Sequence, residues 1–328
     1  MTSNRCPLRY LESRLAALAA IFASISLNGA YAQSIRIVTT TPDIAWMAKE
    51  IGQDKVETIS LLNGSEDPHY VDARPDYVTR ALQADVVCIV GLGLETSWIN
   101  RVLAKTGKQS IQPGGKGYCE LGKRIEALDK PTHAVDRSQG DIHPEGNPHF
   151  WLSPSAFFKA GQEITDTLIR VDTKNAESFL SGYERLQSKL MKKRDELKQK
   201  ILSAGITGKA AHFLEYHKEF AYFAAEYGLQ SNGTIEEKPG VSPSARRIAS
   251  VALLARGSDV SFALASNTAP RKILTRFEEL SGVPVLILPL HVQTQGKWTD
   301  YIDLQEHIVQ SIIDARVKTL SKFKKVEK

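Results

Sequence analysis

Apolar and polar residues alternate along the chain in patterns that mark strands and helices in turn. Residues 35–40 form a β-branched run, which is typical of a strand. A segment with apolar residues every three or four positions begins at Pro42, and this spacing predicts an amphipathic helix. Further strands are expected at residues 56–62 and 86–90, with a helix at about 75–82 between them. This alternation predicts a parallel α/β sheet.

The second half of the chain repeats the alternation. Strands are expected near residues 210–214, 260–265 and 283–288, and a final helix over about 302–320. The predicted fold class is therefore α/β with two lobes, each a small, mostly parallel sheet flanked by helices.

Residues 174–202 have a different pattern, because they contain no proline and carry an apolar residue at every third or fourth position or at twice that spacing. The other faces carry Lys, Glu, Arg and Gln, so the segment predicts one amphipathic helix on the order of 40 Å long. We expect it to join the lobes as a stiff connector. The predicted division is residues 33–172 for the first lobe, 173–203 for the helix and 204–328 for the second lobe.

The N-terminal segment has the pattern of an export signal. Arg5, Arg9 and Arg14 precede an apolar run at residues 15–27, and a small-x-small sequence ends at Ala32. The run is shorter than the ~20 residues that span a bilayer, and no stop-transfer flank follows, which disfavours the alternative of a retained membrane anchor. We expect cleavage after Ala32 and release of the mature chain into the periplasm.

The net charge excludes some partner classes. The formal charge is +5, and residues 1–32 contribute three Arg and one Glu, which leaves about +3 for the mature chain. This excess is too small to indicate binding to nucleic acid or to anionic lipid. No nucleic-acid partner is expected.

Two cysteines remain after the signal, which contains Cys6, is removed. Cys88 lies in the apolar run at residues 86–90, and Cys119 lies in a separate segment. An exported compartment permits a disulfide between them, but the expectation from sequence is two buried thiols. No CxxC motif is present.

Three histidines occupy similar positions at boundaries between predicted elements: His69, His149 and His217. A proline precedes two of them and fixes the backbone there. Neutral imidazole is a good ligand for zinc and its neighbours in the first transition row. Because two of these histidines lie in the first half and one in the second, a metal bound by all three would sit between the lobes.

Taken singly, each histidine has a plainer interpretation as a surface or core residue. The other histidines of the mature chain receive that interpretation: His133, His143, His212 and His307. Loop 129–147, which contains His133 and His143, is expected to be an ordinary solvated loop rather than an auxiliary metal site.

Several short motifs, in order, resemble the zinc/manganese-type (cluster A-I) solute-binding proteins of metal ABC importers. They are DPH at 67–69, GNPHFWL at 146–152, the stretch 217–229, KPGVSPS at 238–244 and the segment 84–95. The resemblance runs from about residue 35 to the final helix. It implies two α/β lobes joined by one long helix, and one metal held in the cleft by three histidines plus a fourth ligand.

The resemblance assigns three ligand roles to His69, His149 and His217. Many members of the family place an Asp after a late strand, and this chain departs from that pattern. Its strand at 285–288 leads instead to His291, which is the candidate fourth ligand. Asp300 and a water molecule are the alternatives.

Such a ligand set favours zinc as the transported ion over manganese, because manganese prefers more carboxylates. We expect a monomer that captures a divalent metal ion and delivers it to the membrane permease of an ABC transporter. The long helix should limit hinge opening.

A zinc hydrolase is the main alternative. It requires an open coordination position and a carboxylate that acts as general base, for which Glu66, Asp67, Glu215 and Glu219 are the nearest residues in sequence. No HExxH motif is present, and four protein ligands would leave no open position for substrate. The expectation is therefore that the chain is not an enzyme. Nothing in the sequence marks an adhesin, a third possibility.

Overall fold

The computed structural model describes residues 34–132 and 140–326, with side chains as far as residue 318. The predicted signal and its cleavage site after Ala32 lie outside the described residues. The described residues from Ile35 onward belong to one compact unit. Within the described part, no helix is both long enough and apolar enough to cross a membrane.

The first half of the chain contains a four-stranded parallel sheet in the order β2-β1-β3-β4. Its strands are β1 (Ile35–Thr39), β2 (Val56–Ser60), β3 (Val86–Ile89) and β4 (Tyr118–Glu120). Its helices are α2 (Pro42–Gly52), α3 (Pro75–Gln83), α4 (Ile99–Thr106) and α5 (Pro154–Val171).

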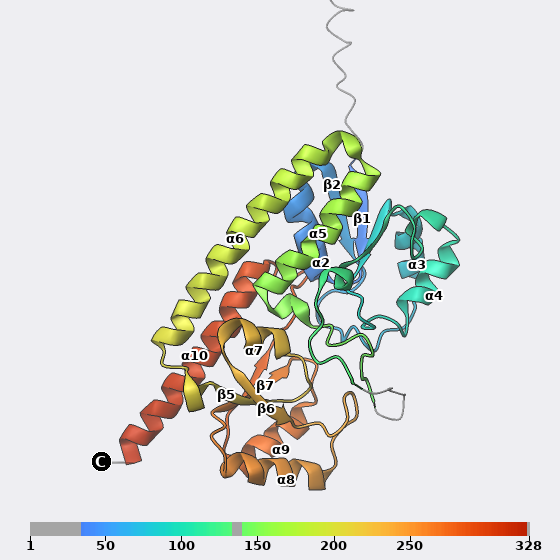
Figure 1. Cartoon of the computed structure of the whole chain (residues 1–328). Coiled ribbons are helices and arrows are strands. Elements are labelled where there is room, and N and C mark those ends of the chain that lie inside the picture. Colours follow the sequence, from blue (N-terminus) through green and yellow to red (C-terminus); the bar gives the residue numbers. More distant parts are fainter. Residues whose placement is uncertain (1–33, 133–139, 327–328) are drawn as a thin grey trace, which may run out of the picture. The chain divides into compact units, whose positions relative to one another are not determined.

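The second half contains another four-stranded parallel sheet, in the order β6-β5-β7-β8. Its strands are β5 (His212–Glu215), β6 (Gln230–Thr234), β7 (Phe262–Ser266) and β8 (Val285–Leu288). Its helices are α7 (Ala221–Tyr227), α8 (Ala245–Arg256), α9 (Arg271–Ser281) and α10 (Tyr301–Val326). In each sheet, the strand that comes first in sequence lies between the second and the third. The predicted fold class is confirmed (Figure 1).

The predicted long helix is also confirmed. Helix α6 runs over Ala176–Ser203 and buries the apolar residues of its stripe against α2, α5 and α10. One hydrophobic cluster contains Leu190 of this helix together with Ile37 of the first sheet and Phe213 of the second. The core is therefore continuous between the two halves. The proposed division into separate lobes at residues 172 and 203 stays a prediction.

The cysteine prediction is wrong, because Cys88 and Cys119 form a disulfide. The two residues are register partners on the neighbouring strands β3 and β4, with their Cα atoms 4.4 Å apart. Strand β4 has only three residues and no strand was expected there, so no sequence pattern indicated that Cys119 lies beside Cys88.

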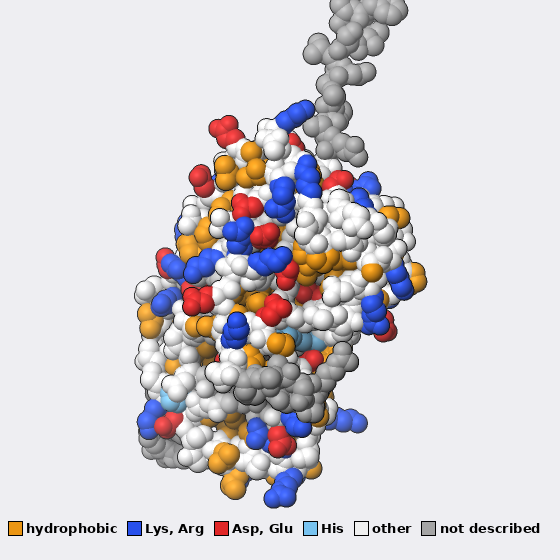
Figure 2. All heavy atoms as spheres, turned by 45° about the vertical axis from the view of Figure 1, so that its right-hand side comes forward, with side chains coloured by type: hydrophobic (Ala, Val, Ile, Leu, Met, Phe, Trp, Pro, Cys, Tyr) orange, Lys and Arg blue, Asp and Glu red, His pale blue; other side chains and the backbone are white. Residues whose placement is uncertain are grey.

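Charged side chains are mixed on the surface. The face in Figure 2 shows Lys and Arg interspersed with Asp and Glu, without an extended field of either sign. This distribution agrees with the small net charge of the chain and gives no support to a nucleic-acid-binding surface.

Candidate metal centre

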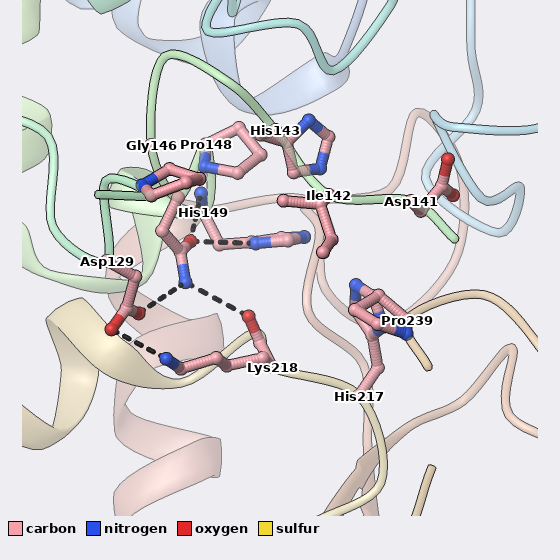
Figure 3. A pocket seen from close by; sticks show the side chains of 12 residues that line it. Asp129, Asp141, Ile142, His143, Gly146, Pro148, His149, His217, Lys218 and Pro239 are labelled. Atoms are coloured by element: carbon pink, nitrogen blue, oxygen red, sulfur yellow. Dashed lines mark hydrogen bonds and ion pairs between the residues drawn. The ribbon is translucent and has the colours of Figure 1, made fainter. Parts of the chain in front are cut away.

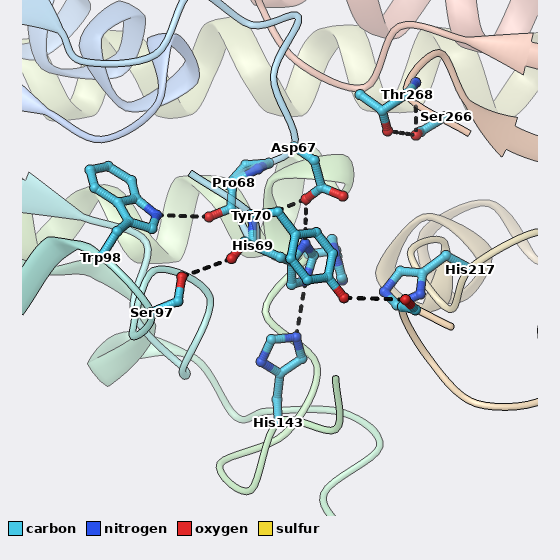
Figure 4. Close-up of polar contacts among 12 residues, drawn as sticks. Asp67, Pro68, His69, Tyr70, Ser97, Trp98, His143, His217, Ser266 and Thr268 are labelled. Carbon is cyan, nitrogen blue, oxygen red and sulfur yellow. Dashed lines mark hydrogen bonds and ion pairs between the residues drawn. The ribbon is translucent and has the colours of Figure 1, made fainter. Parts of the chain in front are cut away.

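Three histidines from distant parts of the chain converge on one point. His69, His149 and His217 each offer a ring nitrogen, and these nitrogens all lie within 4.8 Å of one another. The ring centroids are 5.4 Å apart for His69 and His149, and 5.7 Å apart for His149 and His217. Figure 3 shows His149 and His217 in the lining of a cavity, and Figure 4 shows His69 and His217 among their polar contacts. The structure thus brings together three of the four predicted ligands.

His69 is oriented by the tripeptide in which it lies. Oδ1 of Asp67 accepts hydrogen bonds from both the backbone N–H and the ring Nδ1 of His69, at 3.0 and 2.7 Å. The backbone carbonyl of Pro68 accepts from the indole of Trp98, and that of His69 accepts from Ser97 (Figure 4). These contacts hold the loop after β2 in place, and Nε2 of His69 faces Nε2 of His143 at 3.1 Å.

His149 repeats this arrangement in a second Asx-Pro-His tripeptide. Oδ1 of Asn147 accepts from the backbone N–H of His149 at 3.0 Å and from its Nδ1 at 2.9 Å. The amide nitrogen of Asn147 donates in turn to Asp129 and to the carbonyl of Lys218, which settles which side of the amide faces the imidazole (Figure 3). The sequence contained this repeated motif, but the role of the Asx residue was not predicted.

His217 follows β5 and is held by a different acceptor. Oε2 of Glu236 lies 2.8 Å from Nδ1 of His217 and also accepts from the backbone N–H of Gly240 at 3.1 Å. Glu236 thereby ties the imidazole to the loop that carries the KPG sequence. Sequence reasoning missed Glu236, because it lies 19 residues from His217 and belongs to no ligand motif.

These contacts set the tautomer of all three rings. Carboxylate and amide oxygens can only accept, so in each ring, when it is neutral, Nδ1 carries the proton and the lone pair of Nε2 is left for an ion. Nε2 of His149 is buried and has no hydrogen-bond partner among the described residues. Since buried polar atoms nearly always have a partner, this nitrogen marks a binding position.

The protonation of the ligands differs within the cluster. Burial lowers the pKa of His149 well below its ordinary value, and the neighbouring His69 and His217 lower it further. Burial also lowers the pKa of His217, but the hydrogen bond to Glu236 and the carboxylate of Glu219 outweigh it and raise the pKa to about 9. His149 is therefore neutral and ready to bind, whereas an incoming ion must displace a proton from His217.

His143 lies beside His69, contrary to the expectation that loop 129–147 is plainly solvated, although the group of nitrogens within 4.8 Å of one another does not include it. Its Nε2 lies 3.1 Å from Nε2 of His69, and its ring centroid lies 6.3 Å from that of His149. Burial lowers its pKa to about 3, with His69 adding to the effect, so His143 is a neutral imidazole. A backbone hydrogen bond from Asp141 to the carbonyl of Pro239 holds this part of the loop over the centre.

His291 does not belong to the three-histidine group, although it lines an adjoining cavity with His149. Its Nδ1 is bonded to Oδ2 of Asp43 at 2.5 Å, and its ring stacks on Trp151 with centroids 4.7 Å apart. Asp43 also accepts from the backbone N–H of Val292, so this carboxylate fixes the segment after β8 against α2. These contacts anchor His291 outside the group of nitrogens that lie within 4.8 Å of one another, and its place as fourth ligand stays a prediction.

Asp300, the alternative fourth ligand, is engaged at the start of α10. Its Oδ1 accepts from the backbone N–H of Ile302, and its Oδ2 accepts from the indole of Trp46 at 3.1 Å. Both oxygens are therefore occupied by contacts that orient α10 and α2, and Asp300 lines none of the cavities that contain the three histidines.

Comparison with known families shows to which family the chain belongs. The sequence profile of the family described as "Zinc-uptake complex component A periplasmic" matches residues 37–315, which is most of the chain. The chain belongs to this family. Its members are metal-binding receptors of ABC importers and not enzymes, so the chain is a metal-binding receptor and not an enzyme.

Individual relatives of the chain are distant in sequence. The high-affinity zinc uptake system protein ZnuA of Bacillus subtilis (strain 168) is 22% identical over 288 residues, which are 86% of this chain and 87% of that protein. The zinc-binding lipoprotein AdcA of Streptococcus pneumoniae (strain ATCC BAA-255 / R6) is 24% identical over 285 residues, 86% of this chain. The match covers 55% of that relative, so the chain spans about half the length of AdcA.

Solved structures share the fold of the chain. A crystal structure of ZnuA superposes with a TM-score of 0.71 at 21% identity and covers 87% of this chain and all of that one. The periplasmic zinc-binding protein TroA from Treponema pallidum superposes with a TM-score of 0.71 at 19% identity. The superposition covers 86% of this chain and 99% of that one. The solute-binding protein FpvC from P. aeruginosa, solved with Ni²⁺, superposes with a TM-score of 0.71 at 20% identity. The superposition covers 88% of this chain and 98% of that one.

Proposed function

We propose that the mature chain captures one zinc ion in the periplasm, in preference to manganese, and delivers it as a monomer to the membrane permease of an ABC importer. The observation that carries the proposal is the set of three imidazoles whose Nε2 atoms point to one centre while their Nδ1 atoms are held by acceptors. Zinc-uptake and zinc-binding relatives support the choice of ion. Neutral nitrogen ligands also favour zinc over the harder manganese ion.

The fourth ligand in this proposal is His143. Four imidazoles would complete the tetrahedral shell that zinc prefers, and Nε2 of His143 already lies beside Nε2 of His69. A shell closed by protein ligands suits carriage of the ion, because no coordination position remains for a substrate.

Metal loading tests the function. The mature protein, freed of metal and reloaded, should hold one zinc ion per chain. A manganese-loaded sample should exchange its manganese for zinc when zinc is supplied. Stoichiometry by native mass spectrometry and affinity by chelator competition would check this. Retention of manganese in equimolar competition with zinc would contradict the choice of ion, and absence of tight binding of either ion would contradict the function.

Two alanine variants separate the candidate fourth ligands. We expect His143→Ala to weaken zinc binding by on the order of tenfold or more, because it removes a nitrogen from the shell. His291→Ala should leave zinc affinity nearly unchanged and should lower thermal stability, because Asp43 and Trp151 lose their partner. The reverse pattern would assign the fourth position to His291.

A further inference from the structure

A carboxylate beside the three histidines has no role in the site described so far. Glu219 lies two residues after His217, and its backbone N–H donates to the carbonyl of His217 at 2.8 Å. This backbone hydrogen bond closes a tight turn that contains both Glu219 and His217. Oε2 of Glu219 is enclosed and has no hydrogen-bond partner among the described residues.

Most of the other carboxylates near the centre are engaged. Asp67 and Glu236 each hold an imidazole. Glu66 accepts from the backbone of its own loop, and Glu215 accepts from Phe220 and Ser231. Glu219 and Asp141 each have an enclosed oxygen without a hydrogen-bond partner among the described residues. Both line one cavity with His69 and His217, but only Glu219 also lines the cavity that contains His69 and His149.

Two cavities connect Glu219 with the ligand imidazoles. One, of about 140 Å³, is lined by His69, His217 and Glu219, and a smaller one is lined by His69, His149 and Glu219. Glu219 and His69 therefore line both cavities together. The larger cavity has room for several water molecules at about 30 Å³ each, so an ion at the cluster could keep water ligands on this side.

Zinc and manganese differ in the number and kind of ligands that they prefer. Four-coordinate zinc is satisfied by nitrogen ligands, whereas manganese prefers six ligands with oxygen among them. An enclosed carboxylate oxygen next to a water-sized cavity supplies the kind of donor that the larger shell requires.

We propose that Glu219 is a specificity-determining residue whose Oε2 binds the ion directly when the receptor holds manganese, and that zinc is held without it. This inference rests on the proposed function, because it assigns a role within the same metal centre. It predicts that the receptor accepts manganese as a second, weaker cargo and that this tolerance depends on Glu219.

The test uses the full mature chain and three proteins: wild type, Glu219→Gln and the control Glu237→Gln. Glu237 is exposed on the segment that follows β6 and lines none of the cavities around the centre. Affinities for Mn²⁺ alone and for Zn²⁺ alone are measured by competition with chelators. We expect Glu219→Gln to weaken Mn²⁺ binding by about tenfold and Zn²⁺ binding by less than about twofold, while Glu237→Gln changes neither.

Infrared difference spectra give an independent readout of coordination. Addition of Mn²⁺ to wild type should shift one carboxylate stretching band, and this shift should be missing in Glu219→Gln and absent when Zn²⁺ is added. Equal weakening of both ions, or no weakening of either, would overturn the role of Glu219. If wild type bound neither ion, the proposed function itself would fail, and these outcomes are distinguishable because wild-type zinc binding is measured first.

Discussion

Replacement of His149 by alanine should abolish tight metal binding. His149 is 2% exposed, and its Nε2 is a buried nitrogen without a partner, so it is the least replaceable donor of the cluster. Loss of an outer partner of a metal ligand costs ~10–100-fold in affinity, and loss of the ligand itself should exceed that range. Chelator competition and native mass spectrometry of the reloaded protein would measure the change.

The control for this variant is His307→Ala. His307 lies on α10, where it stacks on Trp298, and it lines none of the cavities around the centre. We expect this control to bind zinc as wild type does. Circular dichroism should show that His149→Ala retains its secondary structure, because the imidazole donates its Nδ1 proton only to the neighbouring Asn147. Wild-type affinity in folded His149→Ala would disprove the assignment of the site.

Zinc affinity should rise with pH by about tenfold per unit between pH 7 and about pH 9, and should level off above that value. The sign follows from His217, whose pKa is raised to about 9. Below that pH the ring is protonated, so binding must release one proton, and each unit of pH then changes the apparent affinity tenfold. His149 contributes nothing to this slope, because its pKa is lowered and it is already neutral.

The variant Glu236→Gln tests whether His217 is the group that releases the proton. The amide still accepts a hydrogen bond from Nδ1 of His217 but removes the negative charge that raises its pKa. We expect the rise in affinity to move toward the ordinary histidine pKa of about 6.5 and the curve to be flat above pH 8. Chelator titrations in matched buffers would record both curves. An unchanged slope in the variant would mean that another group releases the proton.

Much of the fold follows from local patterns. The apolar stripe of α6 and the β-branched runs of β1 and β3 have strong periodicity, and each was predicted near its observed position. Strand β6 was missed, because its sequence QSNGT has no apolar pattern and forms a strand only by pairing with β5 at the edge of the sheet. The disulfide was missed for a related reason, since it depends on the register of β3 and β4.

The site was predictable only where its residues lie in motifs. His69, His149 and His217 stand at the ends of elements, where short sequence signals mark them. The choice between His143 and His291 depends on contacts made across the fold. Asp43 holds His291 from a position 248 residues away, and a backbone bond between Asp141 and Pro239 brings His143 to the centre. No local pattern encodes either contact.

The Asx-Pro-His tripeptides have a consequence for the speed of capture. A free imidazole samples two tautomers, and only one of them can offer a given nitrogen to an arriving ion. In this chain Asp67 and Asn147 have already selected that tautomer and fixed the ring plane before any ion arrives. Capture at these two rings then requires no ring rotation and no proton relocation, so the loss of water from the hydrated ion sets the pace of the first binding steps.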